Sequence, residues 1–277
     1  MEGFGARLRH AIDTRGPLCV GLDPHVELLR SWELGDDVDG LRRFCGTVVE
    51  AIGDVAAVVK PQSAFFERHG SGGVEVLEST IRQLRDTGAL VLLDVKRGDI
   101  GSTAVAYAQA YLDPASSLAV DAITASPFLG FGSLFPMIDM ALSTGSGVFV
   151  LALTSNPEGA AVQRARSHDG RTVAQTILDE VSQVNAGVQP LGSIGVVIGP
   201  EAAGTGHETG RINGPVLVPG MGEQGGRPEH LHVLAHANAG AVLPSYSRQV
   251  LRAGPGGPAL RDATQRARDA CATVLKV

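Results

Sequence analysis

The chain has 277 residues, carries a net charge of -6 with histidine neutral, and is 44% hydrophobic. Its length does not require two domains, because a single α/β barrel often has about 250 residues. Its acidic balance argues against general nucleic-acid binding, which needs a basic surface, but leaves room for one phosphate in a local basic pocket.

Eight short apolar segments recur along the chain, and Gly, Pro, Ser or Asp lies at or just after the end of each. They predict buried strands at 18–22, 55–59, 90–95, 119–124, 147–153, 194–198, 216–218 and 241–243. Helix-like segments lie between them, at 38–52, 74–86, 102–112, 132–142, 173–184, 229–237 and 258–275. Only the connection between the sixth and seventh strands, EAAGTGHETGRIN, is a poor helix.

This alternation predicts the fold. Buried strands separated by helices indicate a parallel sheet that helices cover. Eight such units predict a closed (β/α)8 TIM barrel, with residues 1–277 as a single domain. A doubly wound open sheet is the alternative, although no GxGxxG follows the first strand. The irregular stretches 23–37 and 156–170 follow strand ends, where a barrel places its active-site loops.

The sequence also bears on cellular location. Cys19, Cys45 and Cys271 are odd in number and lack CxxC spacing, so we expect neither a disulfide framework nor a structural zinc site. The first 16 residues interleave charges and contain no apolar core of a secretory signal. No stretch approaches about 20 uninterrupted apolar residues, so we expect no membrane span. Together these features favour a cytoplasmic protein.

A charged cluster ends the third predicted strand. The stretch LVLLDVKRGDIG, residues 90–101, runs from apolar residues into Asp94, Lys96 and Asp99. Because successive side chains of a strand point to opposite faces, Asp94 and Lys96 both face the barrel mouth while Val95 faces the helices. Asp99 lies past the strand end, where its ordinary role would be to cap the next helix. A structural ion-pair network is therefore the alternative to a functional site.

Other predicted strands also end in polar residues. Asp23 follows the first strand, Lys60 the second and the pair Thr154–Ser155 the fifth. The charged groups of the first three strands should therefore converge over one mouth. In an alternating set of acids and lysines, nearby opposite charge favours protonated lysines. A protonated Lys96 is a poor nucleophile but suits electrostatic stabilisation and proton donation.

The stretch DVKRGDIGST resembles the DxKxxDI motif of the orotidine 5'-phosphate decarboxylase family. VGLDP, VVKPQSAFFE, DAITASPFLG, LALTSNPEG and VPGMGEQGG follow the family pattern in order, so the resemblance covers essentially the whole chain. PQSAFFE and SNPEG are similar to its longer bacterial branch. The resemblance implies a TIM barrel that converts orotidine 5'-phosphate to uridine 5'-phosphate, the last step of de novo pyrimidine nucleotide synthesis, without a metal or other cofactor.

The resemblance also implies catalytic roles. Asp23 would bind the ribose hydroxyls, and Lys60 would bridge the ribose and Asp94. Asp94 would sit beside the substrate carboxylate, and Lys96 would donate the proton that replaces carbon dioxide. The family takes the last acid of the motif from the partner subunit. That assigns Asp99, Ile100 and Thr103 to the neighbouring active site and implies a homodimer.

The remaining implied contacts hold the two ends of the nucleotide. Ser155 matches a residue that hydrogen-bonds the pyrimidine, and Thr154 competes for that role because a one-residue shift of the alignment would exchange them. Gln224 matches a loop residue that touches the phosphate and closes over the base. Arg248 matches the arginine that grips the phosphate, although it follows Ser247 here and glycine in the short branch.

Two other functions remain open from the sequence. Sugar-phosphate decarboxylases and aldol-type synthases of the same superfamily share DxKxxD, so a metal-dependent enzyme of that kind is one alternative. A noncatalytic nucleotide-binding barrel is the other. His232 and His236 have the i, i+4 spacing of a metal pair, but no third ligand is in view, so we expect no metal there.

Overall fold

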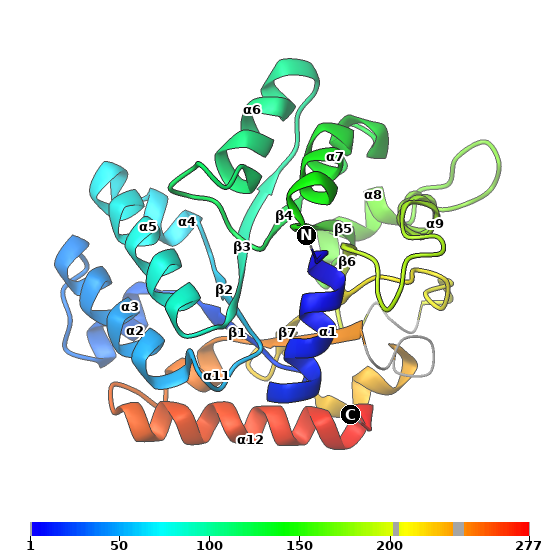
Figure 1. The fold of residues 1–277 in the computed structure, drawn as a ribbon. Coiled ribbons are helices and arrows are strands. Elements are labelled where there is room, and N and C mark those ends of the chain that lie inside the picture. Colours follow the sequence, from blue (N-terminus) through cyan, green and yellow to red (C-terminus); the bar gives the residue numbers. More distant parts are fainter. Residues whose placement is uncertain (1, 202–204, 235–240, 277) are drawn as a thin grey trace.

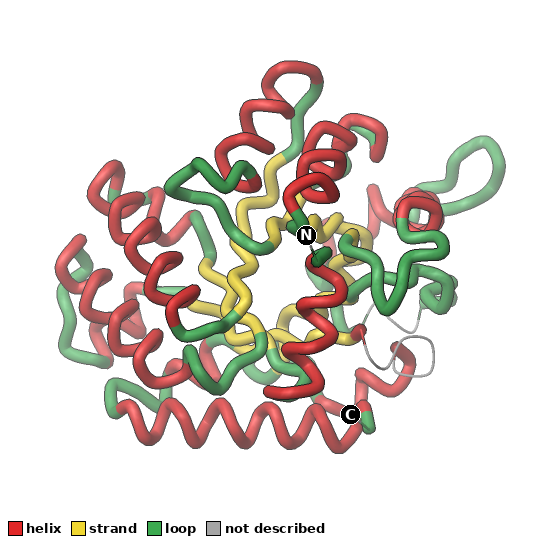
Figure 2. The backbone as a smooth tube through the Cα atoms, in the orientation of Figure 1, coloured by secondary structure: helices red, strands yellow, loops and turns green. Residues whose placement is uncertain are grey.

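Eight parallel strands form a closed barrel in the computed structural model of the chain, which describes residues 2–201, 205–234 and 241–276. Each strand pairs with its neighbours in sequence, and β8 closes the ring on β1, where Cys19 pairs with Ser245. Figure 2 shows the strands as an inner ring with helices outside it. The predicted (β/α)8 TIM barrel is confirmed, and the open doubly wound sheet is excluded. The strands are β1 (Cys19–Leu22), β2 (Val58–Pro61), β3 (Leu90–Arg97), β4 (Ala122–Ala125), β5 (Gly147–Leu153), β6 (Ile194–Ile198), β7 (Val216–Met221) and β8 (Val242–Tyr246).

Helices follow most of the strands and cover the outside of the barrel (Figure 1). The longer ones are α1 (Phe4–Arg15), α3 (Val38–Ile52), α5 (Gly70–Asp86), α6 (Gly101–Leu112), α7 (Phe135–Thr144), α9 (Val173–Val184) and α12 (Gly257–Leu275). The shorter ones are α2 (Val26–Ser31), α4 (Ala64–Glu67), α8 (Ala160–Gln163), α11 (Arg248–Leu251) and the 3-10 helices η1 (Phe131–Leu134), η2 (Pro157–Gly159) and η4 (Pro228–Leu231). Between β6 and β7, the described residues contain no regular helix, in line with the poor helix expected there.

Helix α3 illustrates why the sequence forms these covering helices. Asp37 caps its start, because its carboxylate accepts a hydrogen bond from the backbone N–H of Gly40 over 2.8 Å. Leu41, Phe44 and Val48 recur at a spacing of three or four residues and are buried. One apolar face therefore packs inward, and the polar residues between them face solvent.

Some predicted connections differ from the structure in detail. The irregular stretch 23–37 contains α2, and the stretch 156–170 contains η2 and α8. The helix predicted at 132–142 is divided between η1 and α7, because Pro136 favours the first turn of a new helix. The helix predicted at 229–237 begins as η4, and its residues 235–237 lie outside the described part of the chain.

Helix α1 closes the amino-terminal end of the barrel. Its residues Phe4, Leu8 and Ile12 join one apolar cluster with side chains from the starts of the strands. The ring of Phe4 meets Phe149 of β5 edge to face, with centroids 5.8 Å apart. Gly147 makes this possible, because a Cβ there would lie 2.4 Å from the ring of Phe4. The carboxyl ends of the strands are therefore the open end of the barrel.

The structure bears on two further expectations from the sequence, about disulfides and about membrane-spanning helices. Cys19, Cys45 and Cys271 are all free and buried, so the predicted lack of a disulfide framework is confirmed. Within the residues that the structure places, no helix has both the length and the apolar character of a bilayer span.

Candidate active site

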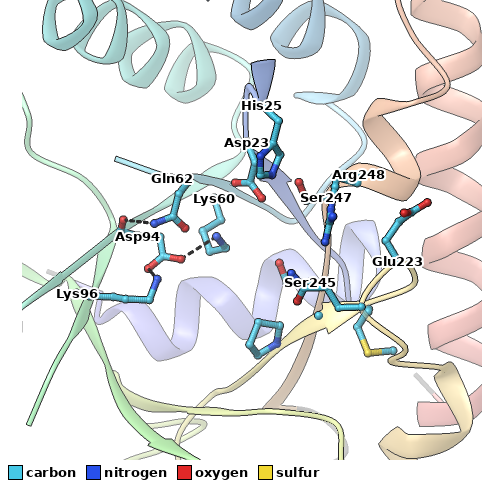
Figure 3. A pocket seen from close by; sticks show the side chains of 14 residues that line it. Asp23, His25, Lys60, Gln62, Asp94, Lys96, Glu223, Ser245, Ser247 and Arg248 are labelled. Atoms are coloured by element: carbon cyan, nitrogen blue, oxygen red, sulfur yellow. Dashed lines mark hydrogen bonds and ion pairs between the residues drawn. The ribbon is translucent and has the colours of Figure 1, made fainter. Parts of the chain in front are cut away.

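A cavity opens at the carboxyl ends of the strands, at the other end of the barrel from α1. Residues of β1, β2, β3, β7 and β8, or of the loops that follow them, line it (Figure 3). The side chains from separate strand ends converge on one mouth, as expected, while their chemical roles stay predictions. Six residues predicted from the sequence line this cavity: Asp23, Lys60, Asp94, Lys96, Gln224 and Arg248.

Asp94 is the centre of an ion-pair network at the mouth. Lys60 Nζ donates to Asp94 Oδ2 over 3.0 Å, and Lys96 Nζ donates to Asp94 Oδ1 over 2.6 Å. The side chains of Lys60 and Asp94 are nearly buried, whereas that of Lys96 is 48% exposed. Lys96 is therefore the ammonium of this network that a ligand entering the cavity reaches most easily.

The chain has three lysines, Lys60, Lys96 and Lys276, and two of them line this cavity. Its other basic side chains, apart from histidine, are arginines, whose planar guanidinium hardly ever releases a proton. A lysine ammonium is compact and does exchange its proton. Two of the three lysines of the chain are therefore concentrated at this one cavity.

Burial and charge act against each other in the pKa values of the network. Burial disfavours a charged Asp94, but the charges of Lys60 and Lys96 outweigh it and hold the pKa of Asp94 well below its usual range. Burial also disfavours a charged Lys60, yet the charges of Asp94 and Asp23 raise the pKa of Lys60 above its usual value. Asp94 is therefore an anion and Lys60 a cation near neutral pH.

A bulge in β3 brings Lys96 to the mouth. Leu93 pairs with Ile123 of β4, but the next pair is Arg97 with Ala125, so β3 carries extra residues between them. Lys96 lies in this bulge with a φ of 46°, in the left-handed region. Such a conformation costs free energy for a residue other than glycine and is common at functional sites.

Two buried polar atoms at the mouth have no hydrogen-bond partner among the described residues. They are Asp23 Oδ1 and Ser247 Oγ, from the loops after β1 and β8. Gly21 lets both side chains approach, because a Cβ there would lie 2.9 Å from the Cβ of Ser247 and 3.2 Å from Asp23 Oδ2. Since buried polar groups normally have hydrogen-bond partners, both atoms are suited to bind a polar ligand.

Arg248 and Gln224 also line the cavity. Arg248 starts α11 and lies across the cavity from Lys96 in Figure 3. The neighbouring carboxylate of Glu223 pairs with Arg252 over 2.5 Å and so does not neutralise Arg248. Among the residues that the structure covers, no carboxylate forms an ion pair with Arg248. Its charge is available to an anionic group of a ligand.

The other predicted residues do not line this cavity. Ser155 is exposed in the loop after β5, and Thr154 beside it is bound by Gln163, whose Nε2 donates to Thr154 Oγ1 over 2.7 Å. The structure thus brings neither candidate for the pyrimidine contact to the mouth. Asp99, Ile100 and Thr103 lie at the start of α6, outside the cavity of their own chain, and Asp99 Oδ1 accepts the backbone N–H of Ile100 over 2.8 Å.

Sequence reasoning missed several residues that form the site. Gln62, His25, Ser245 and Ser247 line the cavity, and Thr124 contacts the network from β4. Gln62 could have been predicted, because it lies two residues after Lys60 and its side chain points to the same face if the strand continues. The other residues are brought to the mouth by loop geometry or by pairing between strands, for which the sequence contains no comparable signal.

A second layer of contacts fixes the segment that carries Lys96. Arg97 Nη2 donates to Glu67 Oε1 over 2.7 Å, and the hydroxyl of Ser63 donates to the same oxygen over 2.6 Å. The guanidinium of Arg97 also lies 5.6 Å from the ring centroid of Tyr107. Residues of the PQSAFFE stretch therefore hold the strand that ends in the charged motif.

Possible metal ligands were predicted only at His232 and His236. In the described ranges, no three His, Cys, Asp or Glu side chains gather as a metal-binding group. His232 follows η4, and His236, its predicted partner in a metal pair, lies outside the described residues.

Comparisons with known proteins agree on one family. A model of the "Orotidine 5'-phosphate decarboxylase / HUMPS family" matches residues 16–263. A protein of Salinispora tropica named orotidine 5'-phosphate decarboxylase is 64% identical over 275 residues, which is 99% of each chain. A protein of the same name from Streptomyces coelicolor is 55% identical over 266 residues, 96% of each chain.

Solved structures give the same picture. A candidate orotidine 5'-phosphate decarboxylase of Streptomyces avermitilis superposes with a TM-score of 0.97 at 53% identity, covering 100% of this chain and 97% of the other. The OMP decarboxylase of Leishmania donovani has a TM-score of 0.75 at 28% identity, covering 99% of both chains.

Proposed function

The chain belongs to the orotidine 5'-phosphate decarboxylase / HUMPS family and decarboxylates orotidine 5'-phosphate to uridine 5'-phosphate, and we propose that the Lys60–Asp94–Lys96 network performs this step. The reaction completes de novo pyrimidine nucleotide synthesis. The observation that carries the proposal is a nearly buried carboxylate held by two ammonium groups at the barrel mouth. Residues 1–277 act as one barrel domain, whose loops after the strand carboxyl ends build the site.

The chemistry replaces one bond to a ring carbon. The bond between the pyrimidine ring and the carboxylate breaks, and its electron pair stays on the ring carbon as carbon dioxide leaves. Lys96 Nζ donates a proton to that carbon, and solvent later restores the proton of Lys96. The ring cannot spread this charge well, so the ammonium of Lys96 must stabilise it as it develops.

Repulsion between Asp94 and the substrate carboxylate is too weak to drive the reaction alone. Two like charges about 4 Å apart interact by about 4 kcal/mol at an effective dielectric near 20. Enzymes lower barriers by about 8–23 kcal/mol. The larger share falls to Lys96 in a site that excludes water. Binding energy from the distant phosphate holds the carboxylate beside Asp94 against the repulsion.

The ribose binds beside Lys60, and the phosphate binds across the cavity from Lys96. Asp23 Oδ1 is buried and has no hydrogen-bond partner among the described residues, and it accepts a hydrogen bond from a ribose hydroxyl. Lys60 bridges the ribose and Asp94. Arg248 and Gln224 hold the phosphate, in agreement with the tendency of barrels to bind phosphate after strands seven and eight. Ser155 keeps its assignment to the base only if the loop after β5 moves inward, and Thr154 remains its competitor.

Activity requires a homodimer in this proposal, because Asp99, Ile100 and Thr103 serve the neighbouring active site. These residues lie beside the loop after β4, where Ser126 N donates to Arg97 O over 2.8 Å. Exposed apolar side chains occupy the two segments: Ile100 is 62% exposed, Phe128 78% and Leu129 53%. A patch of this kind on a globular protein is suited to contact another protein, here a second copy.

A mixing experiment tests the contribution of Asp99 across the interface. Lys96→Ala and Asp99→Ala chains, each inactive alone, are unfolded together and refolded at equal amounts. If Asp99 acts on the neighbouring site, about a quarter of all sites regain both groups, and about a quarter of the activity returns. If Asp99 acts within its own chain, every site keeps one lesion and no activity returns. Sedimentation of the wild-type chain as a monomer would also contradict the dimer.

No cofactor takes part in the proposed mechanism. A spectroscopic assay of orotidine 5'-phosphate turnover, with and without EDTA, tests this together with the activity itself. Equal rates in both assays support the cofactor-free decarboxylase, and loss of activity in EDTA favours a metal-dependent relative. Binding without turnover would favour a noncatalytic barrel. We also place the protein in the cytoplasm, where its three free, buried cysteines remain reduced.

A further inference from the structure

Thr124, in β4, contacts both Asp94 and Lys96 through one hydroxyl. Its Oγ1 donates to Asp94 Oδ1 over 2.7 Å and accepts the backbone N–H of Lys96 over 2.9 Å. The residue is only 2% exposed, so water does not compete for these bonds. A single side chain therefore links the carboxylate of the network to the backbone of its accessible lysine.

The bulge in β3 explains why a hydroxyl is needed at this place. The ladder pairs Leu93 with Ile123 and Arg97 with Ala125, so three residues of β3 lie opposite Thr124 alone. A bulge leaves backbone groups without their regular partners. The hydroxyl of Thr124 accepts the N–H of Lys96 in place of a backbone carbonyl, and this bond holds Lys96 at its positive φ of 46°.

The direction of the two bonds is fixed by chemistry. The backbone N–H of Lys96 can only donate, so the oxygen of Thr124 accepts from it and its single proton goes to Asp94. Asp94 Oδ1 thus accepts from both Thr124 and Lys96 Nζ, while Oδ2 accepts from Lys60. Rotation of the carboxylate would break all three contacts, so Thr124 helps to fix the plane of the Asp94 carboxylate. Through its bond to the backbone N–H, Thr124 also helps to fix the position of the backbone from which the Lys96 side chain extends.

We propose that Thr124 is a positioning residue, which holds Lys96 and Asp94 in the geometry needed for proton transfer to the substrate. This inference rests on the proposed function of Lys96 and adds a residue that does not itself touch the substrate. A misplacement of about 1 Å in a reacting group can lower the rate about 100-fold. The loss of Thr124 should therefore act on kcat rather than on nucleotide binding, which depends on the other side of the cavity.

The alternative is that Thr124 only packs the barrel, as a β-branched residue favoured in strands. Valine has nearly the same shape and no hydroxyl, so Thr124→Val separates packing from hydrogen bonding. Serine keeps the hydroxyl and loses a methyl group. Thr264 provides a matched control in α12, because it is 0% exposed and its hydroxyl donates to Leu260 O over 2.8 Å, remote from the cavity.

The test measures kcat and KM for orotidine 5'-phosphate and the affinity for uridine 5'-phosphate. We expect Thr124→Val to lower kcat about 10- to 100-fold, with KM and product affinity within about threefold of wild type. Thr124→Ser should stay within about threefold of the wild-type kcat. Thr264→Val should keep its kcat although it loses a buried hydrogen bond. If the valine chain does not fold, Thr124→Ala, which leaves space for relaxation, must show the same loss in kcat.

Several results would overturn the proposal. A Thr124→Val enzyme with a wild-type kcat would leave Thr124 with a packing role only. Equal loss in the serine and valine variants would point to shape rather than the hydroxyl, and equal loss in Thr264→Val would point to general destabilisation. A wild-type chain without turnover would instead refute the proposed function, so the two failures are distinguishable.

Discussion

The two ends of the barrel are built from the same strands and differ in what remains unpaired. At the amino-terminal end, α1 fills the interior with Phe4, Leu8 and Ile12, all nearly inaccessible to solvent. At the carboxyl end, the strands present charges, and Asp23 Oδ1 and Ser247 Oγ are buried and find no partner in the part of the chain that the structure describes. The closed end contributes stability through apolar burial, whereas the open end retains unsatisfied groups for a ligand.

The largest effect on activity is expected for a substitution of Lys96, at the open end of the barrel. Lys96→Ala should lower kcat by at least about 1,000-fold, because it removes both the proton donor and the charge that stabilises the ring carbon. Affinity for uridine 5'-phosphate, measured by calorimetry, should change much less. Lys276→Ala, at the far end of α12, is the control and should keep full activity. Near-normal turnover of Lys96→Ala would remove Lys96 from the mechanism.

A substitution of Arg248 tests the proposed phosphate contact, which also lies at the open end of the barrel. Arg248→Ala should lower kcat/KM about 100-fold or more, since the phosphate loses a charge-assisted contact that supplies binding energy for catalysis. At saturating substrate the loss in kcat should be smaller. Steady-state kinetics measure both, with Arg261→Ala as control, because Arg261 pairs with Asp54 on the surface. If neither kcat nor KM changed, the phosphate assignment would be wrong.

At the closed end, a substitution should affect stability and spare the chemistry. Phe4→Ala removes a fully buried ring and should cost about 3–5 kcal/mol in the free energy of unfolding. Val188→Ala, at a side chain that is 41% exposed, should cost less than about 0.5 kcal/mol. Denaturant unfolding measures both costs. A large loss of kcat in folded Phe4→Ala would mean that the two ends are coupled.

The smallest expected effect is in the pH dependence of stability. The folded pKa of Asp94 lies below its ordinary 3.8, so its contribution is full above pH 3.8 and is lost as pH falls through the folded value. The folded pKa of Lys60 lies above its ordinary 10.5, so its contribution is full below pH 10.5 and is lost as pH rises through the folded value.

The pair should therefore contribute a constant amount between these limits. The difference in unfolding free energy between wild type and Asp94→Asn/Lys60→Met should vary by less than about 0.5 kcal/mol from about pH 5 to pH 9. Only in stronger acid or base should the wild type lose this stability advantage over the double variant. A steady drift across neutral pH would mean that one partner already titrates there.

The sequence was most informative where local patterns decide the structure. Short apolar runs predicted the strands of the barrel, and their polar ends predicted the convergence of Asp23, Lys60, Asp94 and Lys96. Two of the strands extend further at their carboxyl ends than predicted, because β2 includes Lys60 and β3 includes Lys96. Alternation placed Asp94 and Lys96 at the mouth, but it gave no sign of the bulge through which Lys96 arrives there.

The rest depends on contacts between distant segments. Thr124 matters because of its position opposite the bulge, and the register of two strands cannot be read from one sequence. Ser247 lines the mouth only because Gly21 leaves space for it. Phe4 and Leu8 have helical spacing, but no local pattern says that their helix fills one end of a barrel. The contribution of Asp99 to a neighbouring active site involves a second chain and stays a prediction.

The most direct test of the central claim is a crystal structure with uridine 5'-phosphate bound. The account predicts that Lys96 Nζ lies within about 3 Å of the ring carbon that held the carboxylate, while Thr124 still contacts Lys96 and Asp94. The phosphate should contact Arg248, and Asp99 of a second copy should reach the same cavity. A nucleotide bound elsewhere, or Lys96 turned away from the ring into solvent, would contradict it.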